Sequence, residues 1–237
     1  MRVFVYLFMF SAVSALAEDT VSIMSIGDSI SRRGHLQTLQ ECLQAAGITN
    51  YEFVGPVEMP GEPKPTNRLA YGGNTLEDML NGRVLKGEQY VSVSQAMTAF
   101  RPDIVLLMGG INNIVRLKEG EGLEQAEHTW EALVDYLVTH SPKTMIFIGS
   151  VTPVNSEKSY ANRQSLIDRL NAYLAKQVHE RHLKGQRVIY VETGAAFNNS
   201  DFNSDGLHPN RSGDTKIGKA WFQALQNSSA IPSKETP

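Results

Sequence analysis

A serine and an aspartate–histidine pair, far apart in the chain, are the residues with the clearest chemical potential. Ser29 stands in the run Gly27-Asp28-Ser29, whereas Asp205 and His208 are separated by only two residues late in the sequence. A serine hydroxyl becomes a nucleophile when an imidazole accepts its proton and a carboxylate orients that imidazole. The pattern therefore predicts Ser29 as nucleophile, His208 as its base and Asp205 as the acceptor that orients the ring.

The residues around Ser29 suit a sharp turn between a strand and a helix. Gly27 allows the backbone to bend, and Asp28 could brace the turn by accepting hydrogen bonds from local amides. The N–H of Ser29 would then lie near a helix start, where it could donate to an oxyanion. An Asp-Ser helix cap explains the same residues without chemistry, so this motif alone does not decide the function.

Two further segments hold groups that could stabilise negative charge on a substrate oxygen. Asn112, followed by Asn113, could donate its side-chain amide, and the N–H of Gly73 could approach a ligand closely because glycine has no side chain. In isolation, the first segment is equally well an Asx turn after a strand. The second is in isolation better explained as a simple glycine turn.

The segment that holds Asp205 also has the spacing of a calcium-binding loop. Asp201, Asn203 and Asp205 precede Gly206 as in the start of an EF-hand. The twelfth position, however, is Ser212 instead of the bidentate glutamate, and a strand pattern leads into the segment where an EF-hand has a helix. We therefore expect no metal site and no cofactor.

Short apolar runs alternate with helical patterns, and this alternation must position the candidate residues. Strands are predicted at residues 21–26, 51–54, 104–108, 144–148 and 187–191, and helices at 36–46, 75–80, 93–100, 123–139, 162–183 and 215–225. Such alternation is typical of βαβ units, so the sequence predicts an α/β fold, a three-layer α/β/α sandwich with a five-stranded parallel sheet. Ligands bind at the carboxyl ends of strands in such sheets, and each polar segment above follows a strand end.

The first residues have the layout of a secretory signal peptide. Residues 1–17 combine Arg2, an apolar stretch and the small-residue ending Ala15-Leu16-Ala17. A membrane anchor is the alternative, but the apolar run is shorter than the roughly 20 residues that a spanning helix needs. We predict a signal peptide at residues 1–17, one catalytic domain at 18–227, a polar tail at 228–237, and a secreted or periplasmic protein with no membrane span after cleavage.

Composition narrows the class of partner. The 237 residues carry a formal net charge of -3 without a cluster of Lys and Arg, which argues against binding to nucleic acid. Cys42 is the only cysteine, so the chain cannot form an internal disulfide. The oligomeric state is left open.

Together the four segments resemble the SGNH, or GDSL, hydrolase family, block by block and in the right order. Ser29 matches the Gly-Asp-Ser block, Gly73 the Gly block, Asn112 the Gly-x-Asn-Asp block, and Asp205 with His208 the Asp-x-x-His block. The resemblance implies a flavodoxin-like sandwich and a serine esterase. It also implies an oxyanion hole formed by the N–H groups of Ser29 and Gly73 and by the side chain of Asn112.

Two positions depart from the family pattern. Asn113 replaces the usual Asp of its block, which changes a residue that, like Asp28, supports the site without donating to the oxyanion. Arg32 and Arg33 stand where the family more often has a small or acidic residue, so the edge of the cleft is expected to be more cationic.

Longer runs at residues 51–55, 71–78 and 101–107 are similar to carbohydrate esterase family 3, a family similar to acetyl xylan esterases. This resemblance implies the removal of O-acetyl groups from a small-molecule or polysaccharide ester. Two alternatives remain: a lysophospholipase or thioesterase that acts on long acyl chains, and a non-catalytic family member that binds glycans. The absence of a long apolar lid segment opposes the first, and the presence of Ser29, Asp205 and His208 together opposes the second.

Overall fold

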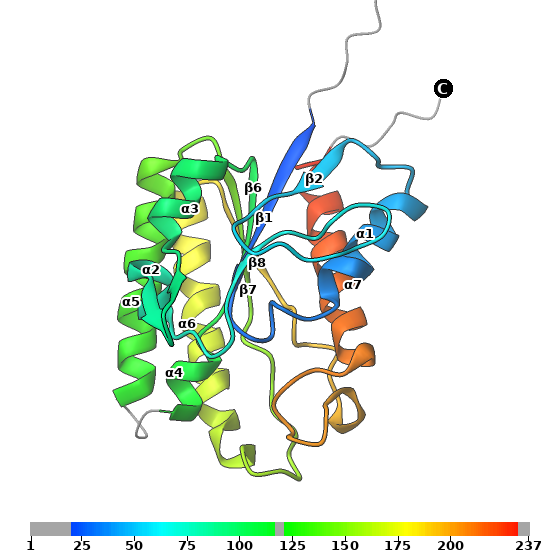
Figure 1. Ribbon diagram of the computed structural model, residues 1–237. Coiled ribbons are helices and arrows are strands. Elements are labelled where there is room, and N and C mark those ends of the chain that lie inside the picture. The colour runs from blue at the N-terminus through cyan, green and yellow to red at the C-terminus, as the bar shows by residue number, and fades with distance from the viewer. Residues whose placement is uncertain (1–19, 117–120, 232–237) are drawn as a thin grey trace, which may run out of the picture.

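The computed structural model describes residues 20–116 and 121–231 (Figure 1). The predicted signal peptide at residues 1–17 and the last part of the predicted tail, residues 232–237, lie outside the described residues. A central sheet is covered by helices on both faces, so the predicted α/β/α sandwich is confirmed. One face carries two helices: α1 (His35–Ala45) and α7 (Arg211–Asn227). The other face carries the helices α2 (Leu76–Asn81), α3 (Val93–Phe100), α4 (Ile111–Arg116), α5 (Glu121–His140) and α6 (Gln164–Leu183).

The strands of the central sheet follow the order β2-β1-β6-β7-β8, and all neighbours are parallel. They are β1 (Val21–Gly27), β2 (Tyr51–Phe53), β6 (Ile104–Met108), β7 (Met145–Gly149) and β8 (Val188–Val191). Every residue of β6 is buried, which explains its unbroken apolar sequence, because a parallel strand is covered on both faces. The order reverses direction between β1 and β6, so β1 lies at the switch point where such sheets bind ligands.

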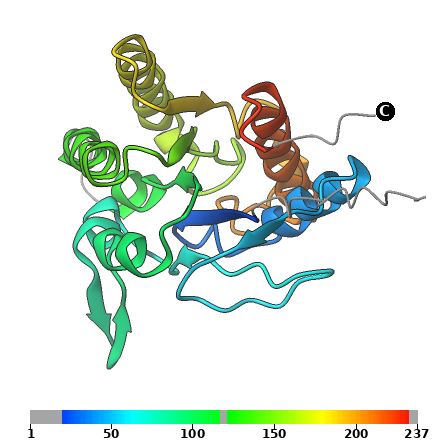
Figure 2. The same ribbon diagram turned by 90° about the horizontal axis from the view of Figure 1, so that it is seen from above.

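Four elements are absent from the sequence prediction. They are β3 (Leu69–Ala70), the antiparallel hairpin of β4 (Arg83–Leu85) with β5 (Glu88–Tyr90), and the short helix α4 (Ile111–Arg116). The five predicted strands form the main order of the sheet, and β3 pairs with β1 as a sixth strand among the described residues. Figure 2 shows the hairpin projecting away from the body of the domain.

Two helices start at capping boxes, which define where the loops before them end. Thr75 accepts a hydrogen bond from the N–H of Asp78 and donates its own N–H to the Asp78 carboxylate, and Ser92 and Gln95 form the same arrangement before α3. These reciprocal bonds satisfy helix N–H groups that lack a partner within the helix. The box at Thr75 holds the end of the Gly72-Gly73-Asn74 turn in place.

The core lies on both sides of the sheet. Its largest fully buried side chains include Trp130 of α5, Trp221 of α7 and Phe147 of β7. Ile231 is also buried, so the packing extends a few residues beyond α7 into the stretch predicted as a tail. Among the described residues, no helix is both long enough and apolar enough to cross a membrane.

Candidate active site

Three strands end at one level of the sheet. The residues that lie side by side there in register are Gly27 of β1, Ala70 of β3 and Met108 of β6. Ser29, Gly73 and Asn112 each follow one of these strand ends within a few residues. The register therefore brings three segments that are far apart in the sequence to one edge of the sheet. The strand that aligns the Gly73 segment is β3, which the sequence prediction does not contain.

The turn that carries Ser29 requires a glycine before it. A Cβ on Gly27 would lie 2.0 Å from the hydroxyl of Ser31 and 2.4 Å from the carbonyl oxygen of Met108. The Ser31 hydroxyl donates to that same Met108 carbonyl, at 3.3 Å, and so ties the turn to β6. Close approach of β1 to its neighbour thus depends on the missing side chain at residue 27.

Asp28 lies beneath the turn and braces it, in the support position that the family resemblance implies. Its Oδ1 accepts the N–H of Ile30 at 2.9 Å, while Oδ2 is buried with no hydrogen-bond partner among the described residues. Burial raises the pKa of Asp28 to about 7, although the Ile30 bond and the charge of Arg116 act in the opposite direction. The group therefore carries a proton over much of the acidic range.

Ser29, His208 and Asp205 form a continuous chain of contacts. The Ser29 Oγ lies 2.9 Å from Nε2 of His208, and Nδ1 of the same ring lies 2.7 Å from Oδ2 of Asp205. The side chain of His208 is 23% exposed and that of Asp205 is 45% exposed, so the pair lies at the surface end of the site. This is the order of contacts that a nucleophile, a base and an orienting acid require.

Asp205 is held in its charged form. Burial favours the neutral carboxyl, but hydrogen bonds from the N–H and ring of His208 and from the N–H of Leu207 outweigh it and lower the pKa of Asp205 to about 2. Its Oδ1 takes the two backbone N–H groups, which leaves Oδ2 for the ring. One carboxylate therefore shapes the loop and orients the imidazole.

The loop that presents Asp205 and His208 is closed at its base. Phe202 and Pro209 form an isolated antiparallel bridge, and the N–H of Asn203 donates to the carbonyl of His208 at 2.9 Å. Asn210 follows the bridge and caps α7, because its side-chain oxygen accepts the N–H groups of the first turn. The loop is thus clamped between a bridge on one side and a helix start on the other.

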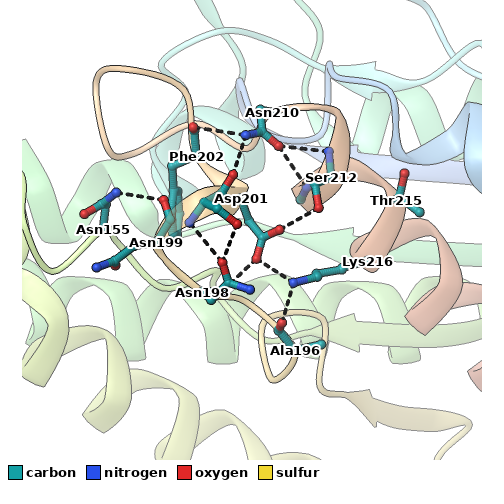
Figure 3. Close-up of polar contacts among 12 residues, drawn as sticks. Asn155, Ala196, Asn198, Asn199, Asp201, Phe202, Asn210, Ser212, Thr215 and Lys216 are labelled. Carbon is teal, nitrogen blue, oxygen red and sulfur yellow. Dashed lines mark hydrogen bonds and ion pairs between the residues drawn. The ribbon is translucent and has the colours of Figure 1, made fainter.

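A buried carboxylate, Asp201, connects this loop to α7 (Figure 3). It accepts hydrogen bonds from the N–H of Asn198 at 2.7 Å, from the hydroxyl of Ser212 at 2.7 Å and from the ammonium of Lys216 at 2.6 Å. These donors lower the pKa of Asp201 against the opposing effect of burial. Sequence reasoning considers Asp201 only as a calcium ligand, whereas its oxygens are occupied by protein donors.

The turn at Gly73 approaches the site from the other side. Gly73 has φ +74°, and a Cβ there would lie 2.5 Å from the guanidinium of Arg116, so residue 73 is restricted to glycine on two grounds. The Nη1 of Arg116 donates to the carbonyl of Gly73 at 2.8 Å. This bond holds the carbonyl of Gly73. The start of the same loop is held next to the Ser29 turn, because the N–H of Tyr71 donates to the Gly27 carbonyl at 3.3 Å.

Asn112 and Asn113 occupy the first turn of α4 and reach toward the same loop. The amide of Asn112 donates to the carbonyl of Asn74 at 2.9 Å, which leaves its second N–H for another acceptor. Asn113 is fully buried, and it accepts the N–H of Leu76 and donates to the carboxylate of Glu77. Its amide therefore supplies both a donor and an acceptor where the family usually has an acid.

Arg68 is a further residue of the site that sequence reasoning does not identify. It is 2% exposed, and its guanidinium donates to the carbonyls of Ser31 at 2.8 Å and Arg33 at 3.0 Å, just beyond the nucleophile. Its remaining bonds go to the carbonyl and hydroxyl of Thr66. Arg68 thus links the Pro-rich segment to the Ser29 turn, and the residues next to it in the sequence offer no pattern that would identify it.

Within the described ranges, no group of three or more His, Cys, Asp or Glu side chains is arranged to hold a metal ion. The carboxylates of the calcium-like pattern, Asp201 and Asp205, face different partners. The chemistry available at this edge of the sheet is therefore that of a hydroxyl, an imidazole, a carboxylate and amide donors.

Comparison with known proteins identifies the family and the fold. Residues 25–216 match the GDSL-like Lipase/Acylhydrolase family, and the chain is 26% identical over 237 residues to a multidomain esterase of Ruminococcus flavefaciens. That alignment covers 89% of this chain but only 29% of the relative.

Solved structures with a similar fold include two carbohydrate esterases of family 3. The one from Talaromyces cellulolyticus has a TM-score of 0.73 at 19% identity and covers 88% of this chain and 98% of its own. The one from Clostridium thermocellum has a TM-score of 0.71 at 22% identity, and the match covers 89% of this chain and 97% of the esterase chain. Both share the fold on which the four sequence blocks lie. The family match over residues 25–216 shows that the chain belongs to the GDSL-like lipase/acylhydrolase family.

Proposed function

We propose that the chain is a serine esterase that removes small acyl groups, acetyl in the first place, from carbohydrate. The observation that carries the proposal is the continuous contact from the Ser29 hydroxyl through the His208 ring to the Asp205 carboxylate. Family membership adds the chemistry of the class, since its members are lipases and acylhydrolases and the aligned relative is an esterase.

Acylation starts at Ser29. With the His208 ring protonated at Nδ1 and bonded there to Asp205, Nε2 accepts the Ser29 proton as Oγ attacks the ester carbonyl carbon. The carbonyl oxygen becomes an oxyanion, which accepts hydrogen bonds from the N–H groups of Ser29 and Gly73 and from the free N–H of Asn112. His208 then passes its proton to the leaving alkoxide, and the alcohol part departs as a neutral sugar hydroxyl.

Deacylation repeats these steps with water. His208 takes a proton from a water molecule that attacks the acyl-Ser29 carbonyl, and the same three donors bind the oxyanion. The ring then returns the proton to Ser29 as acetic acid leaves, and the acid ionises in solvent. No step needs a metal or an organic cofactor. Asp205 stays ionised throughout and stabilises the charged ring.

Two observations favour a small acyl group on a hydrophilic carrier, and a third supports export of the protein. The structural neighbours named above are carbohydrate esterases, and another neighbour is an acetyl esterase with bound acetate. The segment beside the site, residues 56–66, is polar and rich in proline instead of forming an apolar lid. The layout of residues 1–17 supports export of the protein, to the periplasm or out of the cell.

The primary test replaces the nucleophile. Ser29→Ala should reduce kcat on an aryl acetate on the order of 10⁴-fold or more, because the reacting atom is removed while the fold is kept. Ser165→Ala, the same change on the exposed face of α6, is the control and should keep its activity. Turnover by Ser29→Ala within tenfold of the unchanged protein would contradict the proposal.

The same assay separates the two alternatives. A series of aryl esters of increasing acyl length should give the highest kcat/KM at acetate, whereas a lipolytic enzyme would prefer long chains. A non-catalytic glycan-binding protein would leave every ester intact and would not be labelled at Ser29 by a phosphonate inhibitor. Labelling together with a preference for acetate is the result that we expect.

A further inference from the structure

Three arginine side chains meet at the Gly72-Gly73 turn. Arg116 of α4 donates to the carbonyl of Gly73 at 2.8 Å, and Arg83 of β4 donates to the carbonyl of Gly72 at 3.1 Å. Arg32, from the turn after Ser29, places Nη1 3.7 Å from where a Cβ on Gly72 would lie. The turn that supplies one proposed oxyanion donor is therefore surrounded by guanidinium groups from three separate elements.

Only one of these charges is neutralised in the described part of the chain. Arg83 forms an ion pair with Asp78 at 3.1 Å and lies over the ring of Tyr90 at 4.9 Å. Arg32 and Arg116 are exposed, and no carboxylate of the described residues lies within ion-pair distance of either. They stand out because the whole chain is acidic, with a net charge of -3.

The nearby acid, Asp28, compensates Arg116 only in part. Its carboxyl is buried in the turn, and burial raises its pKa to about 7, so it carries less than a full negative charge at neutral pH. The exposed side of the two guanidinium groups consequently faces solvent with most of its positive charge uncompensated.

The unused hydrogen-bonding capacity has a defined chemistry. A guanidinium group has five N–H donors in a planar fork, and Arg116 uses one of them on Gly73. Such a fork matches the two oxygens of a carboxylate, and two of them at one turn favour an anion over a neutral hydroxyl. An acetyl ester has no negative charge, so the anion must belong to the alcohol part of the substrate.

We propose that Arg32 and Arg116 form an anion subsite beside Gly72 and Gly73 that binds a carboxylate on the sugar part of the ester. This inference rests on the proposed function, because it names the substrate class of the same site. Since Arg116 and the oxyanion share Gly73, the carboxylate must lie on the acetylated sugar or on its neighbour. The favoured substrates are therefore acetylated oligosaccharides that contain uronic acids.

The test compares an acidic with a neutral substrate of similar size. The unchanged protein should show a higher kcat/KM for acetylated galacturonide oligomers than for acetylated xylo-oligosaccharides. Replacing both residues, Arg32→Gln with Arg116→Gln, should lower the ratio of the two kcat/KM values about tenfold, the usual effect of losing hydrogen bonds to a charged group. Arg187→Gln, which removes one positive charge at the opposite end of the sheet, should leave the ratio unchanged.

Two further measurements separate a charge effect from a change in folding. The double variant Arg32→Lys with Arg116→Lys keeps both charges and should keep most of the preference. Raising the ionic strength to about 0.5 M, which reduces the screening length well below 10 Å, should weaken the preference of the unchanged protein.

The outcomes distinguish this inference from the proposed function. If the unchanged protein cleaves an aryl acetate through Ser29 but shows no preference for the acidic oligomer, or if the Gln variant keeps that preference, the subsite is overturned and the esterase proposal stands. If no ester releases acetate, the proposed function fails and the subsite fails with it.

Discussion

The carboxylate of Asp205 both shapes its loop and orients the His208 ring. One oxygen accepts two backbone N–H groups and shapes its loop, and the other faces the His208 ring. The bonds that lower its pKa to about 2 keep it ionised at every pH at which the protein is expected to work. Within the proposed triad, Asp205 therefore contributes no change of protonation in the acidic to neutral range.

Replacing that charge by a neutral group should affect catalysis far more than folding. In Asp205→Asn the amide can still accept the two loop N–H groups, but it cannot stabilise a protonated ring or hold its tautomer. We expect kcat on an aryl acetate to fall on the order of 10³- to 10⁴-fold. Thermal unfolding monitored by circular dichroism should change by only a few degrees. A variant that keeps a tenth of the activity would show that Asp205 does not act on His208.

At the scale of elements, the turn at Gly73 links the short strand β3 to the capping box of α2 and presents one proposed donor. Gly73→Ala introduces a side chain at φ +74°, which costs about 1–2 kcal/mol, and pushes it toward Arg116. We expect a modest loss of stability and a fall in kcat on the order of a hundredfold, because the donor N–H is displaced.

Gly185 offers a matched control for this change. It has φ +78°, a Cβ added there would meet no atom within 4 Å, and it lies after α6, away from the site. Gly185→Ala should therefore lose similar stability through backbone strain alone and keep its activity. Equal activity losses in the two variants would show that strain anywhere in the domain, and not the position of Gly73, reduces turnover.

The link between η2 (Asn199–Asp201) and α7 depends on Asp201. Asp201→Asn removes a buried charge opposite Lys216, and we expect a loss of about 2 kcal/mol in the free energy of unfolding, since Lys216 is partly exposed and can turn to water. Asp135→Asn removes the exposed partner of Arg181 and should cost less than about 1 kcal/mol. Urea unfolding of both variants measures the difference, and equal losses would contradict the role given to Asp201.

The elements that sequence reasoning locates are those with an unbroken apolar or amphipathic pattern. The helix predicted at residues 93–100 and the strand predicted at 104–108 have the same bounds in the structure. A cap residue marks the start of the helix, and an unbroken apolar run marks the buried strand. The first turn of α4 is equally well interpreted from sequence as an Asx turn, since asparagine disfavours helix. Tertiary contacts of Asn112 and Asn113 with the Gly73 loop outweigh that preference.

The remaining elements and contacts are too short or too distant in sequence to predict. β3 is two residues long and is defined only by its pairing with β1. The β4–β5 hairpin turns at Lys86 and Gly87, which both have positive φ, without the Asn-Gly or Asp-Gly pair that usually marks such turns. The roles of Arg68, Arg116 and Asp201 depend on partners in other elements, and no local pattern in the sequence records those partners.

For the whole molecule, two buried groups, Asp28 and His35, and the half-buried Asp214 couple folding to pH. Burial raises the pKa of Asp28 to about 7 and that of Asp214 to about 6 from the ordinary value of 3.8, and burial with the nearby charge of Arg68 lowers the pKa of His35 from 6.5 to about 3. Between pH 4 and 6 the two folded carboxyl groups hold protons that the unfolded chain releases, which favours folding at lower pH. In the same pH range His35 gains a proton only in the unfolded chain, and this favours unfolding at lower pH.

The effect of the two carboxyl groups exceeds the opposing effect of the one histidine. We therefore predict that the free energy of unfolding rises as the pH falls from about 7 to about 5. Below about pH 4 the effect of His35 continues, and Asp205 adds to it because its lowered pKa favours folding only while it is ionised. Asp28→Asn removes one of the two favourable contributions, so this variant should gain less stability on acidification than the unchanged protein. Urea unfolding at both pH values measures the gain, and a loss of stability toward pH 5 would contradict the prediction.

The contact between the Ser29 hydroxyl and the His208 ring spans 179 positions of the chain. The helices that follow these residues, α1 and α7, pack so closely that a Cβ on Gly218 would lie 2.5 Å from the carbonyl of His35. A nascent chain that has left the ribosome only as far as residue 200 contains Ser29 but not His208, the proposed acceptor of its proton. On the proposed mechanism, the site is therefore expected to become reactive only late in synthesis, when the segment that carries His208 docks beside Ser29.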